Sequence, residues 1–311
     1  MSLYGALPAR FRRQRILIVG CGDVGQRVAR ELQGRPVRLM ALTSSPQRVD
    51  ELRRLGVTPL VGNLDDRRSL GRLAGLATRV LHLAPPPGDA GDWRRDPRSR
   101  ELVRALMQRS APQALVYGST TGVYGDRQGR WTSEDTPCSP LTPRAWRRVD
   151  AEASVHGYGR MTGARTTVLR IPGIYAPDRE GGTPRERLLR GTPVLRREDD
   201  VFTNHIHADD LAMACLLALW RGRPQRNINV VDDSDLMMGD YFDLAADLYG
   251  LSRPPRVARD AAREQLPLML LSFMSESRRL RNDRMRAELG LRLRYPTVRE
   301  GLGSGDLRCD R

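Results

Sequence analysis

The chain has 311 residues, 40% hydrophobic and 29% charged, so it can bury a sizeable core, and its composition excludes a disordered or collagen-like protein. All 52 basic residues are arginine, against 37 acidic residues, which gives a formal net charge of +15. The absence of lysine excludes every mechanism that needs a lysine amine, including a Schiff base and a phosphate-loop lysine.

Aliphatic runs alternate with segments of helical spacing in the first two thirds of the chain. The unbroken Ile-Leu-Ile-Val run at 16–19 predicts a buried strand over 15–20, and 24–32 predicts the helix that follows. Pro59 places its strand at a sheet edge. Further strands are predicted at 37–42, 57–61, 79–83, 114–117, 166–171 and 227–231, and further helices at 45–55 and 100–109. Strands separated by helices predict a parallel, doubly wound sheet of the α/β class.

The first predicted strand runs into a G-x-G-x-x-G pattern, which reads Gly20-Cys21-Gly22-Asp23-Val24-Gly25. Between a strand and a helix, Gly20 permits the tight turn, Gly22 lets the backbone approach a pyrophosphate, and Gly25 lets the helix pack closely on the strand. The helix N-terminus faces the phosphates with free N–H groups. We therefore predict a dinucleotide site of the Rossmann type, with all six residues in contact with the cofactor.

The segment after the second predicted strand decides which dinucleotide fits. NAD is recognised by an acidic residue that binds the ribose 2′-hydroxyl, about 20 residues beyond the glycines. This chain has Thr43 and Ser44 there, followed by Arg48, and no carboxylate before Asp50. Because hydroxyls and a guanidinium suit a 2′-phosphate, we predict NADP(H), with NAD(H) as the alternative.

Past residue 232 the pattern changes to segments of helical spacing at 236–251, 261–271 and 275–289. They predict a smaller, mostly helical C-terminal lobe. We predict a Rossmann-type domain over 14–178, completed by 203–232, and a substrate-side lobe formed by 179–202 and 233–311.

Three later blocks resemble a known family. They read Leu-Val-Tyr-Gly-Ser-Thr-Thr-Gly-Val-Tyr-Gly-Asp at 115–126, Arg-Ile-Pro-Gly-Ile-Tyr-Ala-Pro at 170–177, and Asn-His-Ile-His-Ala-Asp-Asp at 204–210. Behind the glycine-rich turn, they resemble the extended short-chain dehydrogenase/reductases, the NAD-dependent epimerase/dehydratase family, over roughly 14–300. The resemblance implies a nicotinamide at the carboxyl ends of the strands and a substrate, often a nucleotide sugar, held against it by the C-terminal lobe.

The resemblance also implies a catalytic site and a departure from it. The family uses a Ser or Thr three residues before the Val of the Val-Tyr-Gly block, here Thr120, and a Tyr-x-x-x-Lys pair. Counting back from Glu152, the tyrosine position holds Arg144 and the lysine position holds Arg148. A guanidinium stays protonated at any working pH, so Arg144 cannot exchange a proton as a phenol does, whereas Arg148 can still hydrogen-bond a ribose or a phosphate.

The candidate catalytic residues are therefore Thr120 and Tyr124, and other candidates for the missing acid/base are Tyr158, Tyr175 and His207. Beyond the segments already named, we expect contacts with the dinucleotide from Asn63, Leu83, Ala84, Pro85, Gly118, Arg148, Pro172 and Gly173.

Rival sites fit the sequence less well. His205, His207 and Asp209 resemble a metal motif, but Asp210 occupies its closing position, and we expect Asp209 or Asp210 to cap a helix that begins at Leu211, so no metal is predicted. The segment 118–122 has threonine where a nucleophile elbow needs serine. The arginines are dispersed and aromatics make up only 5% of the chain, which argues against nucleic-acid binding.

The sequence thus favours an NADP(H)-preferring oxidoreductase, or an epimerase/dehydratase homologue, acting on a nucleotide-sugar-like or other anionic small molecule. The alternative is a catalytically silent dinucleotide-binding sensor or regulator. No apolar run approaches the roughly 18 residues of a membrane span, no secretory signal is visible, and four cysteines lie far apart, so we expect a cytoplasmic protein with no membrane partner. We also consider a homodimer.

Overall fold

The computed structural model describes residues 14–88, 92–267, 270–271 and 274–304. At its centre lies a seven-stranded sheet with the strand order β12-β7-β5-β4-β1-β2-β3. Every neighbouring pair in it is parallel, which confirms the predicted doubly wound α/β sheet. The strands are β1 (Arg15–Val19), β2 (Arg38–Thr43), β3 (Thr58–Val61), β4 (Arg79–His82), β5 (Ala114–Thr120), β7 (Arg165–Ile171) and β12 (Arg226–Asn229).

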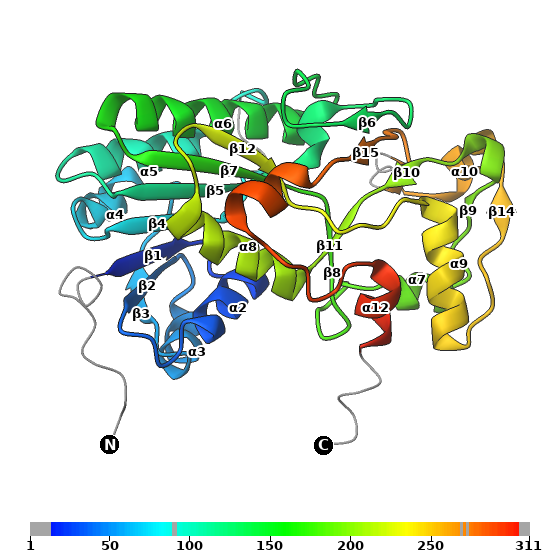
Figure 1. Ribbon diagram of the computed structural model, residues 1–311, viewed down its shortest axis with the longest axis horizontal. Coiled ribbons are helices and arrows are strands. Elements are labelled where there is room, and N and C mark those ends of the chain that lie inside the picture. Colours follow the sequence, from blue (N-terminus) through cyan, green and yellow to red (C-terminus); the bar gives the residue numbers. More distant parts are fainter. Residues whose placement is uncertain (1–13, 89–91, 268–269, 272–273, 305–311) are drawn as a thin grey trace.

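Helices cover both faces of this sheet (Figure 1). α5 (Pro97–Met107) and α6 (Pro143–Thr162) lie on one face, and α2 (Asp23–Glu31) and α8 (Ala208–Arg221) lie on the other. The shorter α3 (Val49–Arg54) and α4 (Arg67–Leu70) follow β2 and β3. As predicted from Pro59, β3 is an edge strand, which pairs with β2 alone in the sheet.

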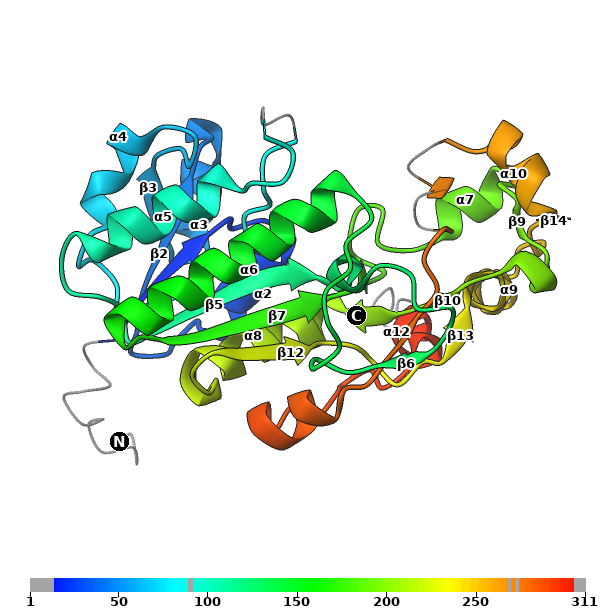
Figure 2. The same ribbon diagram turned by 90° about the horizontal axis from the view of Figure 1, so that it is seen from above.

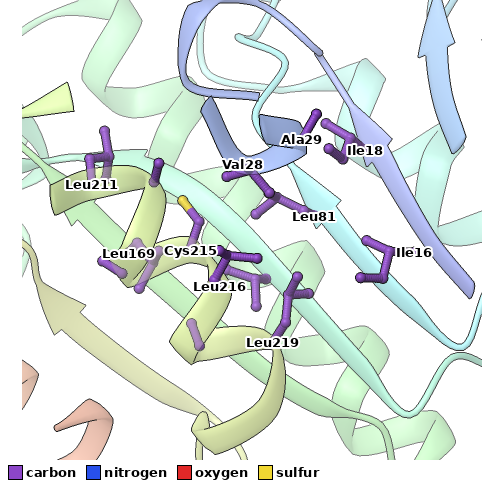
Figure 3. Packing of buried hydrophobic residues seen from close by; sticks show 14 of the residues in the cluster. Ile16, Ile18, Val28, Ala29, Leu81, Leu169, Leu211, Cys215, Leu216 and Leu219 are labelled. Carbon is purple, nitrogen blue, oxygen red and sulfur yellow. The ribbon is translucent and has the colours of Figure 1, made fainter. Parts of the chain in front are cut away.

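The alternation of side chains along each strand divides the core into two clusters. Ile16 and Ile18 of β1 pack with Val28 of α2 and with residues of α8 (Figure 3). Leu17, between them in sequence, belongs to the opposite cluster with residues of α5 and α6. Because successive side chains of a strand point to opposite faces, an unbroken aliphatic run is buried on both sides.

A third hydrophobic cluster lies beyond the sheet, toward the right of Figure 2. Its helices are α7 (Arg185–Leu189), α9 (Met238–Tyr249), α10 (Arg259–Gln265) and α12 (Val298–Gly303). In the part of the chain that the structure describes, four two-stranded sheets accompany the main one: β8 (Gly173–Tyr175) with β11 (His205–His207), β9 (Val194–Leu195) with β14 (Arg256–Val257), β10 (Phe202–Thr203) with β13 (Leu236–Met237), and β6 (Trp131–Thr132) with β15 (Arg279–Leu280). The domain limits given above stay a prediction.

The predicted continuous helix over 275–289 is wrong. Arg279 and Leu280 pair as a strand with β6, and the Leu280 amide donates to the Asn204 side chain (3.1 Å). Helical structure in this segment is therefore confined to 283–289, of which Met285–Leu289 form a π-helical turn. The helix predicted over 261–271 begins as α10, and residues 268 and 269 of it lie outside the described residues. No helix in the described ranges is long and apolar enough to cross a membrane.

Candidate functional site

The predicted cofactor residues gather at one edge of the main sheet. The glycine-rich turn follows β1, Thr43 ends β2, and Asn63 follows β3. Leu83, Ala84 and Pro85 follow β4, Gly118 lies near the end of β5, and Pro172 and Gly173 follow β7. Because all these strands are parallel, their carboxyl ends meet at the same edge, where open α/β sheets bind ligands. Contact of these residues with a dinucleotide stays a prediction.

The geometry of the glycine-rich turn matches the role that each glycine has in the pattern. Gly20 has a φ of +88°, and a Cβ atom there would lie 2.7 Å from the Ala84 Cα atom. Gly25 packs on β1, since a Cβ atom would lie 3.3 Å from the Ile18 Cγ2 atom. A Cβ atom on Gly22, the N-cap of α2, would meet nothing within 4 Å. Space for a ligand is therefore left at Gly22, beside the positive end of the α2 dipole.

Ion pairs surround the first turn of α2, and no motif in the sequence indicates them. The buried Arg27 guanidinium pairs with Asp23 (3.2 Å), Asp178 (2.7 Å) and Asp209 (2.5 Å). Arg179 donates to the other Asp23 oxygen (2.7 Å). The arginines neutralise the carboxylate that Asp23 places beside the phosphate-binding turn, and they tie α2 to residues more than 150 positions away.

The segment predicted to hold the adenosine ribose carries Thr43, Ser44 and Arg48, and the Glu51 carboxylate lies beside Arg48. The Thr43 hydroxyl accepts a hydrogen bond from the Ser45 amide (3.2 Å), and Ser44 is exposed. Arg48 donates to the Cys21 carbonyl oxygen (2.7 Å) and to Glu51 (3.1 Å). The guanidinium of Arg48 thus lies against the glycine-rich turn. The Cys21 side chain is buried in this turn, and burial raises the pKa of its thiol to about 11.

The two candidate catalytic residues differ in their exposure to solvent and in their hydrogen bonds. Thr120 is half-buried at the end of β5, and its hydroxyl oxygen accepts from the Gly122 amide (3.2 Å). Tyr124 is 0% exposed, its hydroxyl donates to Asn229 (2.7 Å), and burial raises its pKa to about 12. The Tyr124 hydroxyl is therefore buried and hydrogen-bonded within the core, and this geometry does not support a catalytic role for it. Tyr158, Tyr175 and His207 are buried as well.

Both arginines at the expected Tyr and Lys positions lie on α6. Arg148 is buried, and its Nη1 atom donates to the Gly118 carbonyl (2.6 Å) and the Tyr117 hydroxyl (3.1 Å). Arg144 is exposed one turn earlier. Behind Arg148, His82 is fully buried with its Nε2 atom 2.9 Å from the Ser99 hydroxyl, and burial lowers its pKa to about 3. Neither Arg148 nor a neutral His82 supplies a proton at neutral pH.

The histidine pair of β11 belongs to an aromatic cluster. His205 stacks near Tyr241 (ring centroids 4.2 Å apart) and His207 near Tyr295 (3.9 Å). The expectation that Asp209 or Asp210 caps the next helix is wrong, because α8 begins at Ala208 and the His207 Nδ1 atom accepts from the Asp209 amide. Asp210 instead accepts from the amides of Arg294 and Tyr295. Within the described ranges, no group of three or more His, Cys, Asp or Glu could hold a metal ion.

Asp232 lies near this cluster, and its burial leads us to predict that the stability of the fold depends on pH. It is 4% exposed, and its Oδ2 atom has no hydrogen-bond partner among the residues that the structure describes. Burial, with smaller contributions from Asp233 and Asp210, raises its pKa from 3.8 to about 8. Between about pH 4 and 8 the folded state keeps this proton while the unfolded state has lost it. The free energy of unfolding therefore falls as pH rises from about 4 to 8, and the whole contribution of Asp232 is lost above that window.

We expect Asp232→Asn to remove this loss. Its stability gain over the wild type is expected to grow by on the order of 1 kcal/mol per pH unit across the window and to level off above it. Urea unfolding at pH 5, 7 and 9 measures the gain, with the exposed Asp283→Asn as control. A gain that does not change with pH would contradict the expectation.

Known proteins match the chain along most of its length. The sequence profile of the NAD dependent epimerase/dehydratase family matches residues 16–230. A 3-diazoavenalumate denitrifying reductase from a Streptomyces species is 25% identical over 307 residues, which cover 93% of this chain and 99% of that protein. An uncharacterized UDP-glucose epimerase, YtcB of Bacillus subtilis (strain 168), is 29% identical over 119 residues, covering 36% of this chain and only 37% of the relative's own length.

Solved structures match the whole architecture. A functionally unknown conserved protein from Silicibacter pomeroyi DSS has a TM-score of 0.79 and 30% identity, covering 96% of this chain and 100% of that chain. UDP-glucose 4-epimerase from Thermotoga maritima, solved with UDP-glucose, has a TM-score of 0.77 over the same shares of the two chains, and its 20% identity limits that likeness to the fold. Since the family profile covers well over half of the sequence, the chain belongs to the NAD dependent epimerase/dehydratase family.

Proposed function

We propose that this chain is an NADP(H)-binding oxidoreductase that works without the Tyr-x-x-x-Lys pair used in its family. The observation that carries the proposal is the open space at Gly22, at the N-terminus of α2 and at the edge where the strand ends meet. A dinucleotide bound there supplies or accepts a hydride at its nicotinamide. The residues after β4, β5 and β7 lie along the same edge and would hold its nicotinamide half.

The preference for NADP(H) rests on the end of β2. Thr43, Ser44 and Arg48 offer hydroxyls and a guanidinium, and the hydrogen bond from Arg48 to the Cys21 carbonyl holds that guanidinium beside the glycine-rich turn. Its other partner is Glu51, whose pKa is lowered chiefly by the hydrogen bond from Arg48. A 2′-phosphate would compete with Glu51 for the same guanidinium, which can bind phosphate oxygens in a bidentate manner.

A reductase fits this site better than an epimerase. Epimerisation at a carbinol carbon oxidises and then re-reduces it, so it requires a group that first takes the hydroxyl proton and later returns it, and a guanidinium at position 144 or 148 cannot do so. A carbonyl reduction requires only that the oxygen gain a proton as the carbon gains the hydride, and solvent water would supply that proton. The Thr120 hydroxyl can donate a hydrogen bond to a substrate oxygen and so orient it, because its own oxygen already accepts from the Gly122 amide. The Streptomyces relative, which covers 93% of this chain, is named a reductase. A nucleotide sugar, such as the UDP-glucose bound by the Thermotoga epimerase, remains the alternative substrate class.

The second candidate function is a catalytically silent sensor or regulator that binds the dinucleotide without turnover. Arginine at positions 144 and 148 and the buried hydroxyl of Tyr124 favour it, because they leave no proton relay. Loss of NADPH absorbance with aldehydes or ketones as hydride acceptors would favour the reductase. Tight binding without turnover would favour the sensor.

Calorimetric titration with NADPH and NADH tests the cofactor proposal. We expect the wild type to bind NADPH about tenfold more tightly than NADH, because a charge-assisted contact with the 2′-phosphate is lost with NADH. Arg48→Gln should remove most of that difference. Arg53→Gln, which removes the same charge from an exposed side chain of α3, should preserve it. Tighter binding of NADH by the wild type would contradict the preference.

A further inference from the structure

Three arginines of α6 share one side of the helix near its N-terminus. Arg144, Arg147 and Arg148 are spaced three and four residues apart, which places them next to one another on the helix surface. Arg147 and Arg148 are only 8% and 7% exposed, whereas Arg144 is exposed. α6 begins at the carboxyl edge of the sheet, since Arg148 bonds the Gly118 carbonyl and a Cβ atom on Gly122 would lie 3.8 Å from that of Ala145.

These three guanidiniums have no carboxylate partner among the residues that the structure describes. Arg148 donates only to the neutral oxygens of Gly118 and Tyr117, and Arg144 and Arg147 make no hydrogen bond or ion pair there. The Nε atoms of Arg147 and Arg148 are buried, and no described residue accepts a hydrogen bond from them. By contrast, the buried Arg27 and Arg170 are both ion-paired.

The nearest carboxyl groups are committed elsewhere. Asp150 binds Arg100 (2.5 Å), and Glu152 binds Arg170 (2.8 Å) and the Ser119 hydroxyl (2.5 Å). Asp96 caps α5 by accepting from the amides of Arg98 and Ser99. A buried guanidinium without an ion-pair partner is costly. Asp96 interacts electrostatically with Arg148 but forms no ion pair with it, so among the described residues this end of α6 carries more positive than negative charge.

We propose that Arg144 and Arg148 form a subsite that binds an oxyanion group of the substrate, a carboxylate or a phosphate, beside Thr120 and the nicotinamide end of the cofactor site. The inference rests on the proposed function in that it places a substrate there. Guanidiniums bind such groups through paired N–H bonds, and two of them one helical turn apart can hold one anion between them. Arg144 and Arg148 thus orient an anionic substrate where the family places a proton relay.

Calorimetry with small anions tests the subsite in the full chain at constant ionic strength, once without a dinucleotide and once with excess NADP+. We expect benzoate to bind and benzamide, its uncharged counterpart, not to bind. Arg144→Gln should weaken benzoate about fivefold and Arg148→Gln about tenfold. Arg160→Gln, an exposed residue of the same helix, removes the same charge and should change affinity less than twofold. The relative affinities of benzoate and inorganic phosphate decide which oxyanion the subsite prefers.

Three results separate this inference from the proposed function. If NADPH binds and benzoate binds equally to the wild type and Arg144→Gln, the subsite is wrong and the cofactor proposal stands. If Arg144→Gln weakens NADP+ as much as benzoate, the anion bound there is a cofactor phosphate and the subsite is also wrong. If benzoate binding depends on both arginines while neither dinucleotide binds, the subsite stands and the proposed function fails. Because Arg144 is exposed, its variant keeps the test valid even if Arg148→Gln does not fold.

Discussion

Gly20→Ala is expected to destabilise the protein by about 3–5 kcal/mol, through backbone strain and overlap together. Gly20 has a φ of +88°, where a side chain is strained. Its Cβ atom would also lie 2.7 Å from the Ala84 Cα atom and 2.8 Å from the Leu83 carbonyl carbon. Those backbone atoms cannot move freely, because the amides of Leu83 and Ala84 both donate to the Val19 carbonyl (2.7 and 3.0 Å).

Urea unfolding measures this loss, and Gly34→Ala is the matched control. Gly34 has a φ of +73° but open space around it, so its substitution carries only the conformational penalty of about 1 kcal/mol. A Gly20→Ala loss no larger than that of Gly34→Ala would show that the turn adapts to a side chain. The close contact between the turn after β1 and the residues after β4 would then not be required for stability.

Gly22→Ala is expected to fold with native stability and to lose dinucleotide affinity by roughly 100-fold. Gly22 has a φ of −78°, which alanine adopts, and a Cβ atom there would meet no protein atom within 4 Å. That methyl group would fill the space through which a pyrophosphate approaches the N–H groups of α2. The two glycines of one turn are therefore predicted to differ in kind, with Gly20 needed for folding and Gly22 for binding.

Calorimetry with NADPH measures the affinity of Gly22→Ala, and urea unfolding confirms that it is folded. Gly71→Ala is the control, because that glycine also has open space and a negative φ (−55°) but lies away from the carboxyl ends of the strands. It should keep both stability and affinity. NADPH binding by Gly22→Ala within threefold of the wild type would mean that no pyrophosphate lies at the start of α2.

Most of the sheet could be predicted because the signal is local. Strands buried on both faces read as aliphatic runs, as at 16–19, whatever their partners are. The end of β5 could not be predicted in this way. Gly118 and Ser119 have weak strand propensity, and the strand continues through them to Thr120 because all three residues pair with residues 169–171 of β7. The same kind of distant pairing, between β15 and β6, replaced the helix predicted over 275–289.

The location of the candidate site was also predictable, while the state of its side chains was not. Parallel strands place their carboxyl ends at one edge, so the order of the motifs along the chain already indicates where a cofactor would bind. Nothing near Tyr124 in sequence indicates that its hydroxyl donates a hydrogen bond to Asn229, which is 105 positions away. Likewise, no pattern around Asp232 shows that its carboxyl is buried beside other acidic groups.

By itself, the sequence determined the fold class, the glycine-rich turn and the absence of any lysine, because these depend on residue type and local order. Only the tertiary structure decided which of the 52 arginines are neutralised. Arg27 and Arg170 meet carboxylates supplied by other elements, whereas Arg144 and Arg148 meet none among the described residues. The physical reason is that ion pairing depends on distances of a few ångströms between groups far apart in sequence, and those distances exist only once the chain has folded.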